Sequence, residues 1–433
     1  MTQVLYEAFQ SEIFYYFYCM KILFVISFLF LIDLYFYLGT ISVINKLLSN
    51  KIIIYKLIYW FVSILIYIGI IYIFINYEKK TPSVRFNNNI IYTSIVFIFF
   101  ISKLIGLIPL IIDDFLRLFR GIFSFFYSSL PIDSHGFTRL EFLRKSALIV
   151  SGTLFSTLLF GMTWGRYNFK KNFQDIFIDN WPADLEDYKI VQISDLHLGS
   201  FNNVKKLEEV VDIINAENAD LVVFTGDLVN NYYYEAEPYV KTLERIKAKD
   251  GKFSILGNHD YCDYVMLRRS SKEWKENFNR LLQLEKEAGF DLLLNDARII
   301  SVGDRGFNLV GVENWGAGNF NKDGDLEKAM SYVKNNKPTI LLSHDPSHWS
   351  EVVLKSGYSI DLQLSGHTHG MQFGIEIPGF KWSPAEYRYK QWAGLYQEGS
   401  SQIYVNRGIG HLGYAGRVGI MPDISILTIK KRT

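Results

Sequence analysis

Four long apolar runs near the start of the chain constrain its fold more than any other feature. They cover about residues 22–39, 52–75, 90–112 and 147–165. A helix needs roughly 20 apolar residues to cross a bilayer. Helices that are apolar on all sides have no soluble partner to cover them. We therefore expect an all-α transmembrane region of about four helices, and an integral, multi-pass membrane protein.

The composition changes near residue 168, where the apolar region gives way to the mixed composition of a soluble α/β domain. We expect a transmembrane region over residues 1–166, a linker over 167–186 and a globular domain over 187–433. The chain is 49% hydrophobic with a net charge of +1, which gives no indication of nucleic-acid binding. Its two cysteines, Cys19 and Cys262, cannot define a disulfide framework.

Charged residues near the apolar runs bear on the membrane topology. Lys56 and Lys103 interrupt the second and third runs. Because each lies within a few turns of a run's end, we expect snorkelling to the membrane surface, with an intramembrane functional site as the alternative. Basic residues on the two sides nearly cancel under the positive-inside rule. The basic run TRLEFLRKSALIVSG at residues 138–152 resembles a signal anchor, which favours a globular domain outside the cytoplasm.

The second half of the chain alternates between strand and helix periods. Residues 188–194 and 221–225 are typical of buried strands, and residues 203–218 of an amphipathic helix between them, which makes a βαβ unit. Many strands and fewer helices favour an α/β fold of two sheets packed together between helical layers. We expect further strands at 253–256, 292–302, 307–312, 339–342, 361–364, 401–405 and 424–429, and helices at 238–248 and 272–288.

Five short polar motifs follow apolar strand-like runs, and they contain five of the eight histidines. In chain order they are DLH at 195–197, GDLV from 226, GNHD at 257–260, SHD at 343–345 and GHTHG at 366–370. Ligands gather beyond the carboxyl ends of strands in parallel α/β units, so we expect these motifs at one side of a sheet. Asp, Asn and neutral His suit two adjacent divalent transition metals. DLH or SHD alone is more often a strand-end carboxylate with a surface histidine, GNHD is more specific and GHTHG more specific still, and together the motifs indicate a two-metal site.

The order DxH, GD, GNH[DE], H and GHxH resembles the calcineurin-like metallophosphoesterase superfamily, and most closely its membrane-attached bacterial branch. The resemblance covers about residues 187–430 and includes KWSPAEYRYKQWAGLYQEG at 381–399 and YVNRGIG at 404–410. Ser365, Met371 and Ala415 depart from the family pattern, but none of them removes a ligand. The resemblance implies a metallophosphoesterase domain over 187–433, built as a two-sheet sandwich flanked by helices.

The resemblance also implies a role for each motif residue. Two divalent metal ions would be bound, and Mn, Fe or Zn suit the ligand types, with Mg possible. A hydroxide bridging them would attack phosphorus in line with the leaving oxygen. One metal would be held by Asp195, His197 and His369, the other by Asn258, His344 and His367, and Asp227 would bridge both.

His259 follows the asparagine ligand, and the family pattern implies that it is the general acid. Asp260 is expected either to hold the His259 imidazole in its catalytic tautomer or to serve in a salt bridge or backbone cap. By the same resemblance the glycine-rich loop after residue 405 borders the active site. Asn406, Arg407 and Tyr414 are its expected substrate contacts.

Three functional classes fit these features. The first is a membrane-attached metal-dependent phosphoesterase acting on a phosphorylated small molecule or lipid. The second is a lipid-linked nucleotide pyrophosphatase of the acylated-sugar type, with the aromatic region of residues 382–396 helping to admit an acyl chain. The third is a non-enzymatic membrane protein with a structural or signalling metal site. An intact His259 argues against the third class, because a structural site has no need of an acid beside the metals.

Overall fold

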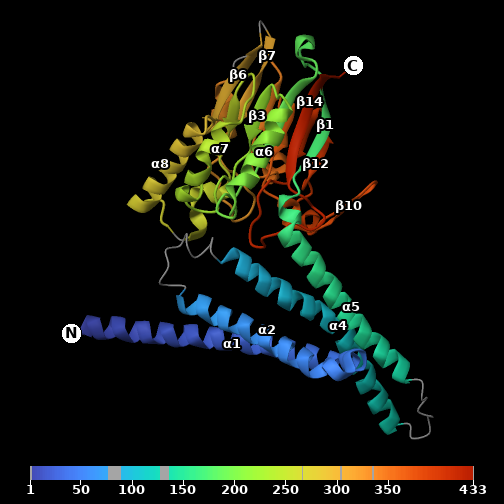
Figure 1. Cartoon of the computed structure of the whole chain (residues 1–433). Coiled ribbons are helices and arrows are strands. Elements are labelled where there is room, and N and C mark those ends of the chain that lie inside the picture. Colours follow the sequence, from blue (N-terminus) through green and yellow to red (C-terminus); the bar gives the residue numbers. More distant parts are fainter. Residues whose placement is uncertain are drawn as a thin grey trace. The chain divides into compact units, whose positions relative to one another are not determined.

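The computed structural model describes residues 2–76, 89–126, 136–265, 267–302, 305–333 and 336–432 (Figure 1). The chain forms two compact units. Residues 1–81 and 91–159 form the helical unit, and residues 82–90 and 160–433 form the sheet unit.

The described residues of the helical unit form four long helices, as the four apolar runs predict. Three stretches are long and apolar enough to cross a membrane: Met20–Ile75, Ile90–Phe123 and Glu141–Tyr167. The first holds two helices joined by a 3-10 turn at Ser49–Lys51. The helices are α1 (Thr2–Leu48), α2 (Ile52–Asn76), α4 (Ile90–Phe126) and α5 (Gly136–Thr163), whose last turn belongs to the sheet unit.

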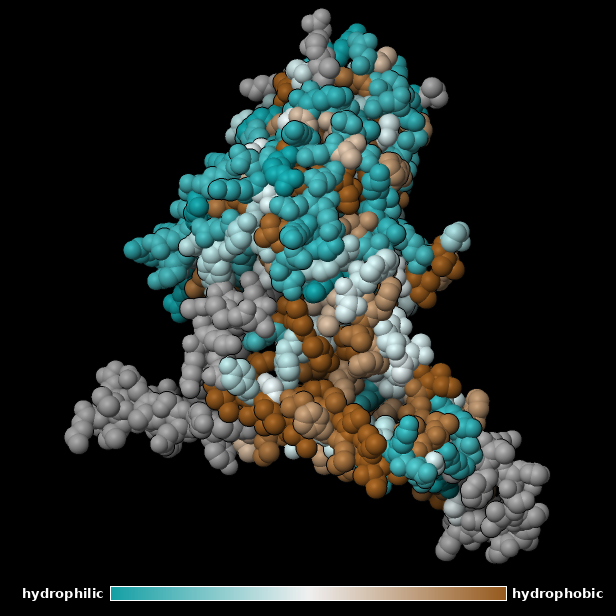
Figure 2. Space-filling model, viewed as in Figure 1, coloured by the Kyte–Doolittle hydropathy of each residue, from teal (hydrophilic) through white to brown (hydrophobic). Residues whose placement is uncertain are grey.

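Apolar side chains cover the outside of the helical unit, and a polar cluster lies inside it. Figure 2 shows hydrophobic residues over these helices. Asp33 is fully buried, pairs with the ammonium of Lys103 and accepts hydrogen bonds of 2.9 Å from Tyr59 and Tyr67. The Lys103 nitrogen lies 3.4 Å from the ring centroid of Phe99. The expectation that Lys103 snorkels is therefore wrong, because an acidic partner on α1 holds its charge inside the bundle.

The sheet unit consists of two six-stranded sheets and a separate hairpin. The first sheet has the order β1-β14-β2-β3-β4-β5 and the second β12-β13-β9-β8-β7-β6, while β10 pairs with β11. The strands are β1 (Lys170–Ile178), β2 (Tyr188–Ile193), β3 (Leu221–Phe224), β4 (Lys252–Ser254), β5 (Asp291–Leu292), β6 (Asp296–Val302), β7 (Arg305–Gly311), β8 (Thr339–Leu342), β9 (Leu362–Ser365), β10 (Ile375–Ile377), β11 (Phe380–Trp382), β12 (Gly394–Glu398), β13 (Ser401–Val405) and β14 (Asp423–Lys431). The helices are α6 (Val204–Ala216), α7 (Val240–Glu244), α8 (Lys272–Glu287), α9 (Leu326–Ser331) and α10 (Ser347–Glu351).

Three apolar cores separate four layers. The central core lies between the sheets and joins residues of β2 and β3 to residues of β7, β8 and β9. An outer core packs α6, α7 and α8 on the first sheet, and another packs α9 and α10 on the second. The expected two-sheet sandwich flanked by helices is confirmed.

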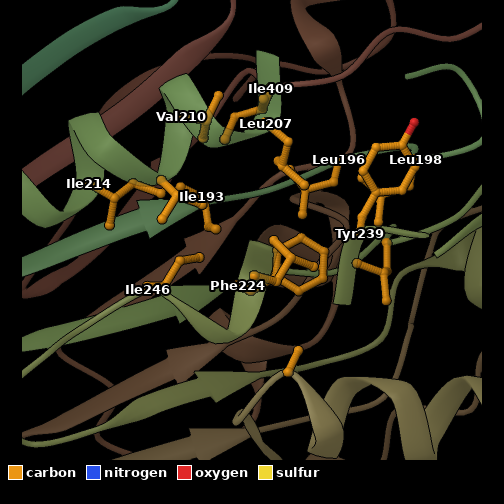
Figure 3. Packing of buried hydrophobic residues seen from close by; sticks show 14 of the residues in the cluster. Ile193, Leu196, Leu198, Leu207, Val210, Ile214, Phe224, Tyr239, Ile246 and Ile409 are labelled. Atoms are coloured by element: carbon orange, nitrogen blue, oxygen red, sulfur yellow. The ribbon is translucent and has the colours of Figure 1, made fainter. Parts of the chain in front are cut away.

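The first outer core shows why the sequence period predicts this packing. Leu207, Val210 and Ile214 recur at helical spacing and are buried along one side of α6. Figure 3 shows Ile214 beside Ile193 at the end of β2. The side chain of Asn203 caps the helix by accepting a hydrogen bond from the Lys205 backbone N–H at 3.0 Å, which satisfies one of the orphan donors at a helix start.

The expected linker over 167–186 is part of the fold. Its β1 pairs with β14 in parallel along nine residues, from Lys170 against Asp423 to Ile178 against Lys431. Trp181 follows and is almost fully buried in the central core. Only alternate residues near the end of β1 are buried, so the segment lacks the continuous apolar run that predicts a central strand.

Candidate active site

Five strand ends supply the polar motifs, but they belong to two sheets. The turns after β2, β3 and β4 in the first sheet carry Asp195, Asp227 and Asn258, and each of these strands is parallel to the next. Parallel strands β8 and β9 of the second sheet precede His344 and the GHTHG turn. The motifs therefore meet at one edge of a sandwich, which corrects the expectation of a single sheet.

The backbone is strained where it presents these side chains. Five motif residues have a positive φ, a conformation that costs energy for residues other than glycine. Gly226, with φ of 93°, permits the turn that carries Asp227. The five residues are Asp195 (φ 51°), His197 (45°), Asp227 (60°), His367 (71°) and His369 (50°).

The first group of possible metal ligands is Asp195, His197 and His369, all buried. The Nε2 atoms of the two histidines lie 3.0 Å apart, and Nε2 of His369 lies 3.2 Å from Oδ1 of Asp195. Three acceptor-type atoms thus converge on one point, an arrangement suited to a shared cation.

The second group is Asp227, His344 and His367. Nε2 of His344 lies 3.2 Å from Oδ2 of Asp227 and 3.2 Å from Oδ1 of Asn258, which is also 2.8 Å from Nδ1 of His367. Oδ2 of Asp227 is 3.6 Å from Nε2 of His197 in the first group. One carboxylate oxygen therefore reaches both groups.

The carboxylate of Asp227 and the imidazole of His344 shift each other's pKa. Although burial raises the pKa of Asp227, the neighbouring His344 imidazole outweighs burial and holds that pKa well below its ordinary value. Burial lowers the pKa of His344, but Asp227 outweighs it and raises the pKa to about 10. A buried carboxylate that needs this much positive charge fits a cation site.

Several residues outside the predicted set orient the ligands. The Thr225 carbonyl lies 2.6 Å from Nδ1 of His344 and leaves Nε2 for a metal. The Tyr389 hydroxyl lies 2.8 Å from Nε2 of His367, and the Asp345 carboxylate lies 3.4 Å from the same atom. Asp345 belongs to the SHD motif, so the sequence carries a signal for it, but Tyr389 reaches His367 only through the fold.

The fully buried Arg417 contacts His369 of the first group and the backbone around it. Its guanidinium donates to the backbone carbonyls of Arg407, Gly408, His369 and Gly410, and one of its nitrogens lies 3.1 Å from Nδ1 of His369. No sequence signal predicts this contact, because a lone arginine in a glycine-rich loop is usually exposed.

His259 lies beside the metal groups with its ring held by the backbone. Its Nδ1 is 2.8 Å from the carbonyl oxygen of Asn230, and its backbone N–H donates to Oδ1 of Asp227 at 2.8 Å. The ring stands edge-on to His197, with centroids 4.9 Å apart. Burial lowers the pKa of the imidazole.

Asp260 does not touch the His259 ring. Its carboxylate accepts hydrogen bonds of 2.9 Å from the backbone N–H groups of Asp227, Leu228 and Gly257. Burial raises its pKa to about 7. The geometry therefore corresponds to the capping alternative, and the Asn230 carbonyl takes the place expected for Asp260 in fixing the imidazole tautomer.

The three expected substrate contacts all have partners within the sheet unit. Asn406 is fully buried, and its amide donates to Ser425 Oγ at 2.8 Å. The Arg407 guanidinium pairs with Glu376, and the ring of Tyr414 stacks on Phe373 with centroids 5.1 Å apart. None of these contacts brings the three residues into the two metal groups, so their contact with substrate stays a prediction.

Comparison with known proteins agrees with this site. Residues 188–371 match the family described as "Calcineurin-like phosphoesterase", and residues 20–166 match "Probable Calcineurin-like phosphoesterase, transmembrane domain". The chain is 32% identical to the "Uncharacterized metallophosphoesterase YkuE" of Bacillus subtilis, over 58% of this chain and 81% of that protein. The chain therefore belongs to the calcineurin-like phosphoesterase family.

Two further relatives carry more specific names. The chain is 30% identical to the "UDP-2,3-diacylglucosamine pyrophosphatase LpxG" of Chlamydia trachomatis, over 53% of this chain and 79% of that protein. It is 28% identical to the "Phosphodiesterase YaeI" of Escherichia coli, over 56% of this chain and 82% of that protein. This protein is thus a membrane-associated metallophosphoesterase, a hydrolase acting on phosphoric ester bonds, and the non-enzymatic alternative is set aside.

Proposed function

We propose that the two ligand groups hold two divalent cations and form one catalytic centre for phosphoester hydrolysis. Asp195, His197 and His369 would hold the first cation, Asn258, His344 and His367 would hold the second, and Asp227 would bridge them. The observation that carries the proposal is the position of Oδ2 of Asp227. This atom lies 3.2 Å from Nε2 of His344 and 3.6 Å from Nε2 of His197.

Carboxylate, amide and imidazole ligands suit Mn, Fe or Zn, with Mg as a further option. When bound, such a pair lowers the pKa of a shared water and neutralises charge on the phosphoryl oxygens. The protein's own contribution is to hold these ligands rigidly, through strained turns and outer hydrogen bonds.

His259 supplies the proton for the leaving oxygen. Because Nδ1 donates its proton to the carbonyl of Asn230, Nε2 is the free nitrogen: it must first take up a proton to form the imidazolium, and it then passes that proton to the leaving oxygen and returns to the neutral ring. The ring of Tyr264 lies 4.5 Å from that of His259, and its hydroxyl accepts a hydrogen bond from Asn258 at 2.7 Å. Tyr264 therefore packs against the proposed acid and tethers the asparagine ligand beside it.

The first candidate substrate is a phosphomonoester or phosphodiester, and the second is a lipid-linked nucleotide diphosphate. The relative from Chlamydia trachomatis, named for an acylated-sugar pyrophosphatase, favours the second. Asn406, Arg407 and Tyr414 remain the proposed substrate contacts in the glycine-rich loop, and they would need to exchange an internal partner for substrate.

The sheet unit is proposed to lie outside the cytoplasm, as the basic run at residues 138–152 of α5 suggests. Protease added to intact cells would then cleave it. Protection in intact cells, with cleavage only after lysis, would place the unit inside.

The function is tested with the full-length protein in detergent, freed of metal and resupplied separately with Mn, Fe, Zn or Mg. The substrates are a nitrophenyl monoester, a nitrophenyl diester, an alkyl diester and a nucleotide-linked acylated sugar. We expect hydrolysis with at least one metal, and a preference for the acylated sugar over the diesters would select the pyrophosphatase. No hydrolysis of any substrate with any metal would contradict the proposal.

The same assay tests whether His259 is the general acid. His259→Ala should lower turnover of the alkyl diester by roughly 10² to 10⁴ but affect the nitrophenyl ester less, because nitrophenolate leaves without a proton. Metal content, measured by mass spectrometry, should stay at the wild-type value. Equal losses on the two diesters would contradict the assignment.

A further inference from the structure

The β10–β11 hairpin has one apolar face and one polar face. Its register pairs Ile375 with Trp382 and Ile377 with Phe380, and it pairs Glu376 with Lys381. Side chains alternate across a strand, so the two apolar pairs share one face and the charged pair lies on the other. Figure 1 shows the hairpin projecting from the sheets, and Figure 2 shows hydrophobic side chains gathered on this projection.

The polar face is the one that the rest of the sheet unit holds. Glu376 pairs with the guanidinium of Arg407, and the Lys381 ammonium donates to the carbonyl of Ala393 at 2.6 Å. The apolar side chains are left outside: Ile375 is 49% exposed, Ile377 57% and Phe380 52%. A two-stranded hairpin is marginally stable alone, and three adjacent exposed apolar side chains mark a surface with a partner.

The base of the hairpin is fixed to the end of an apolar span. Phe373, two residues before β10, forms a β-bridge with Val418, and the Gly374 N–H donates to the Val418 carbonyl at 2.9 Å. Val418 packs so closely on Gly161 of α5 that a Cβ there would lie 2.4 Å from its Cγ2. The Arg417 N–H also donates to the Gly161 carbonyl at 3.2 Å.

That end of α5 has the composition of a membrane boundary. The candidate span Glu141–Tyr167 finishes four residues after Thr163, the last residue of α5. Phe160 and Trp164 expose 55% and 51% of their surface there, and aromatic side chains concentrate at membrane–water interfaces. Val418 therefore joins the last turn of α5, which lies in the sheet unit, to the strand that leads into β10.

We propose that the β10–β11 hairpin inserts its apolar face, Ile375, Ile377, Phe380 and Trp382, into the interfacial layer of the same bilayer that α5 crosses. The partner is a lipid surface. Burial of these side chains among acyl chains and glycerol groups removes the apolar face from water. This insertion rests on the fold alone and does not depend on the proposed reaction.

The hairpin lies between residues of the proposed metal site in the chain. The hairpin follows His369 directly in the chain, and the segment after it leads to Tyr389, which contacts His367. Both sides of the hairpin are thus tied to proposed metal ligands.

The insertion is tested by site-directed fluorescence on the full-length protein in phosphatidylcholine–phosphatidylglycerol vesicles. Cys19 and Cys262 are replaced by serine, and Phe380→Cys carries an environment-sensitive label. The matched control is Ile299→Cys, because Ile299 is a 54% exposed apolar residue on β6, at the edge of the second sheet. Quenching is measured with lipids that carry a spin label near the headgroup.

We expect blue-shifted emission and strong quenching at position 380, and water-like, unquenched emission at position 299. Unquenched, water-like emission at both positions would overturn the proposal. Blue-shifted emission at position 380 that lipids do not quench, and that grows with protein density in the vesicles, would assign the face to a second copy of the chain and also overturn it.

A second measurement uses no label. The double variant Ile377→Ser and Phe380→Ser should hydrolyse a soluble phosphodiester at the wild-type rate, since neither residue contacts a proposed ligand. Because the chain has eight tryptophans, the Trp382 signal is taken as the difference between each protein and its Trp382→Phe counterpart, and in the double variant this signal should lose quenching by brominated lipids relative to wild type. Unchanged quenching of the variant would contradict insertion even if the protein proved inactive on every phosphoester.

Discussion

In the helical unit, large apolar side chains such as Leu23 and Phe24 face outward, and the charged pair of Asp33 and Lys103 is enclosed. In the sheet unit three apolar cores lie between the layers, and polar residues gather beyond strand ends in a second enclosed cluster. Both units bury charge, but they satisfy it differently. In the helical unit every charge of the cluster has a protein partner, whereas the sheet unit brings two carboxylates and four imidazoles together in two groups whose donor atoms suit cations from outside. Buried charge with full internal pairing indicates structure, and buried donor atoms grouped to suit a cation indicate a site.

The largest expected effect comes from removing the Asp227 carboxylate, which reaches both groups of possible metal ligands. Asp227→Ala should abolish detectable hydrolysis and lower the metal content of the purified protein. Loss of an outer-shell partner alone costs roughly 10- to 100-fold, and a bridging ligand should cost more. Metal analysis and initial rates measure both effects. Wild-type metal content with wild-type activity would remove Asp227 from the centre.

Substitutions in the buried pair of Asp33 and Lys103 should lower the stability of the protein without changing its catalytic residues. Lys103→Met leaves the Asp33 carboxylate buried without its counter-charge, which we expect to destabilise the protein by roughly 3 to 5 kcal/mol. Adding Asp33→Asn should recover much of that loss. Thermal unfolding in detergent measures both variants. Equal stability of the single variant and wild type would mean that this pair does not hold the helices together.

An intermediate effect is expected at the hydrogen bond that orients His367. Tyr389→Phe removes only the hydroxyl that lies 2.8 Å from Nε2. We expect a 10- to 100-fold loss of metal affinity or activity, as is typical of outer-shell partners. Tyr387→Phe is the matched control, since Tyr387 is 79% exposed two residues away. The same change in both variants would rule out a specific role for Tyr389.

The smallest expected effect concerns a buried histidine of the sheet unit that belongs to neither metal group. Burial lowers the pKa of His348 to about 4, and its Nδ1 is 2.9 Å from Ser343 Oγ. Its folded pKa lies below its unfolded value, so the unfolded chain binds the extra proton and stability falls as pH drops from about 6.5 toward 4. His348→Gln should reduce this loss by about 1.4 kcal/mol at pH 5.5. Parallel pH profiles of the two proteins would contradict the assignment.

The parts that can be predicted from the sequence are those with local signals. Helical spacing at Leu207, Val210 and Ile214 predicts α6, and continuous apolar runs predict the central strands. The motif order locates the residues of both metal groups, because each follows a strand end. The capping role of Asp260 stays one of two alternatives, since spacing alone does not say which backbone groups surround a carboxylate.

The remaining features depend on contacts between distant segments. The strand β1 is stabilised by β14, more than 250 residues later, and its own sequence alternates only weakly. The partner of Lys103 lies 70 residues away on another helix, and Tyr389 meets His367 across 22 residues of chain. No local period encodes such pairs, so only the folded structure reveals them.

The central claim is that the two ligand groups form one catalytic centre with a shared carboxylate. It is tested most directly by titrating the metal-free, full-length protein with Mn²⁺ while following hydrolysis of a nitrophenyl diester. The account predicts that activity rises to a plateau at two equivalents per chain and that Asp227→Ala shows no rise. A plateau at one equivalent, or an equal rise in the variant, would contradict it.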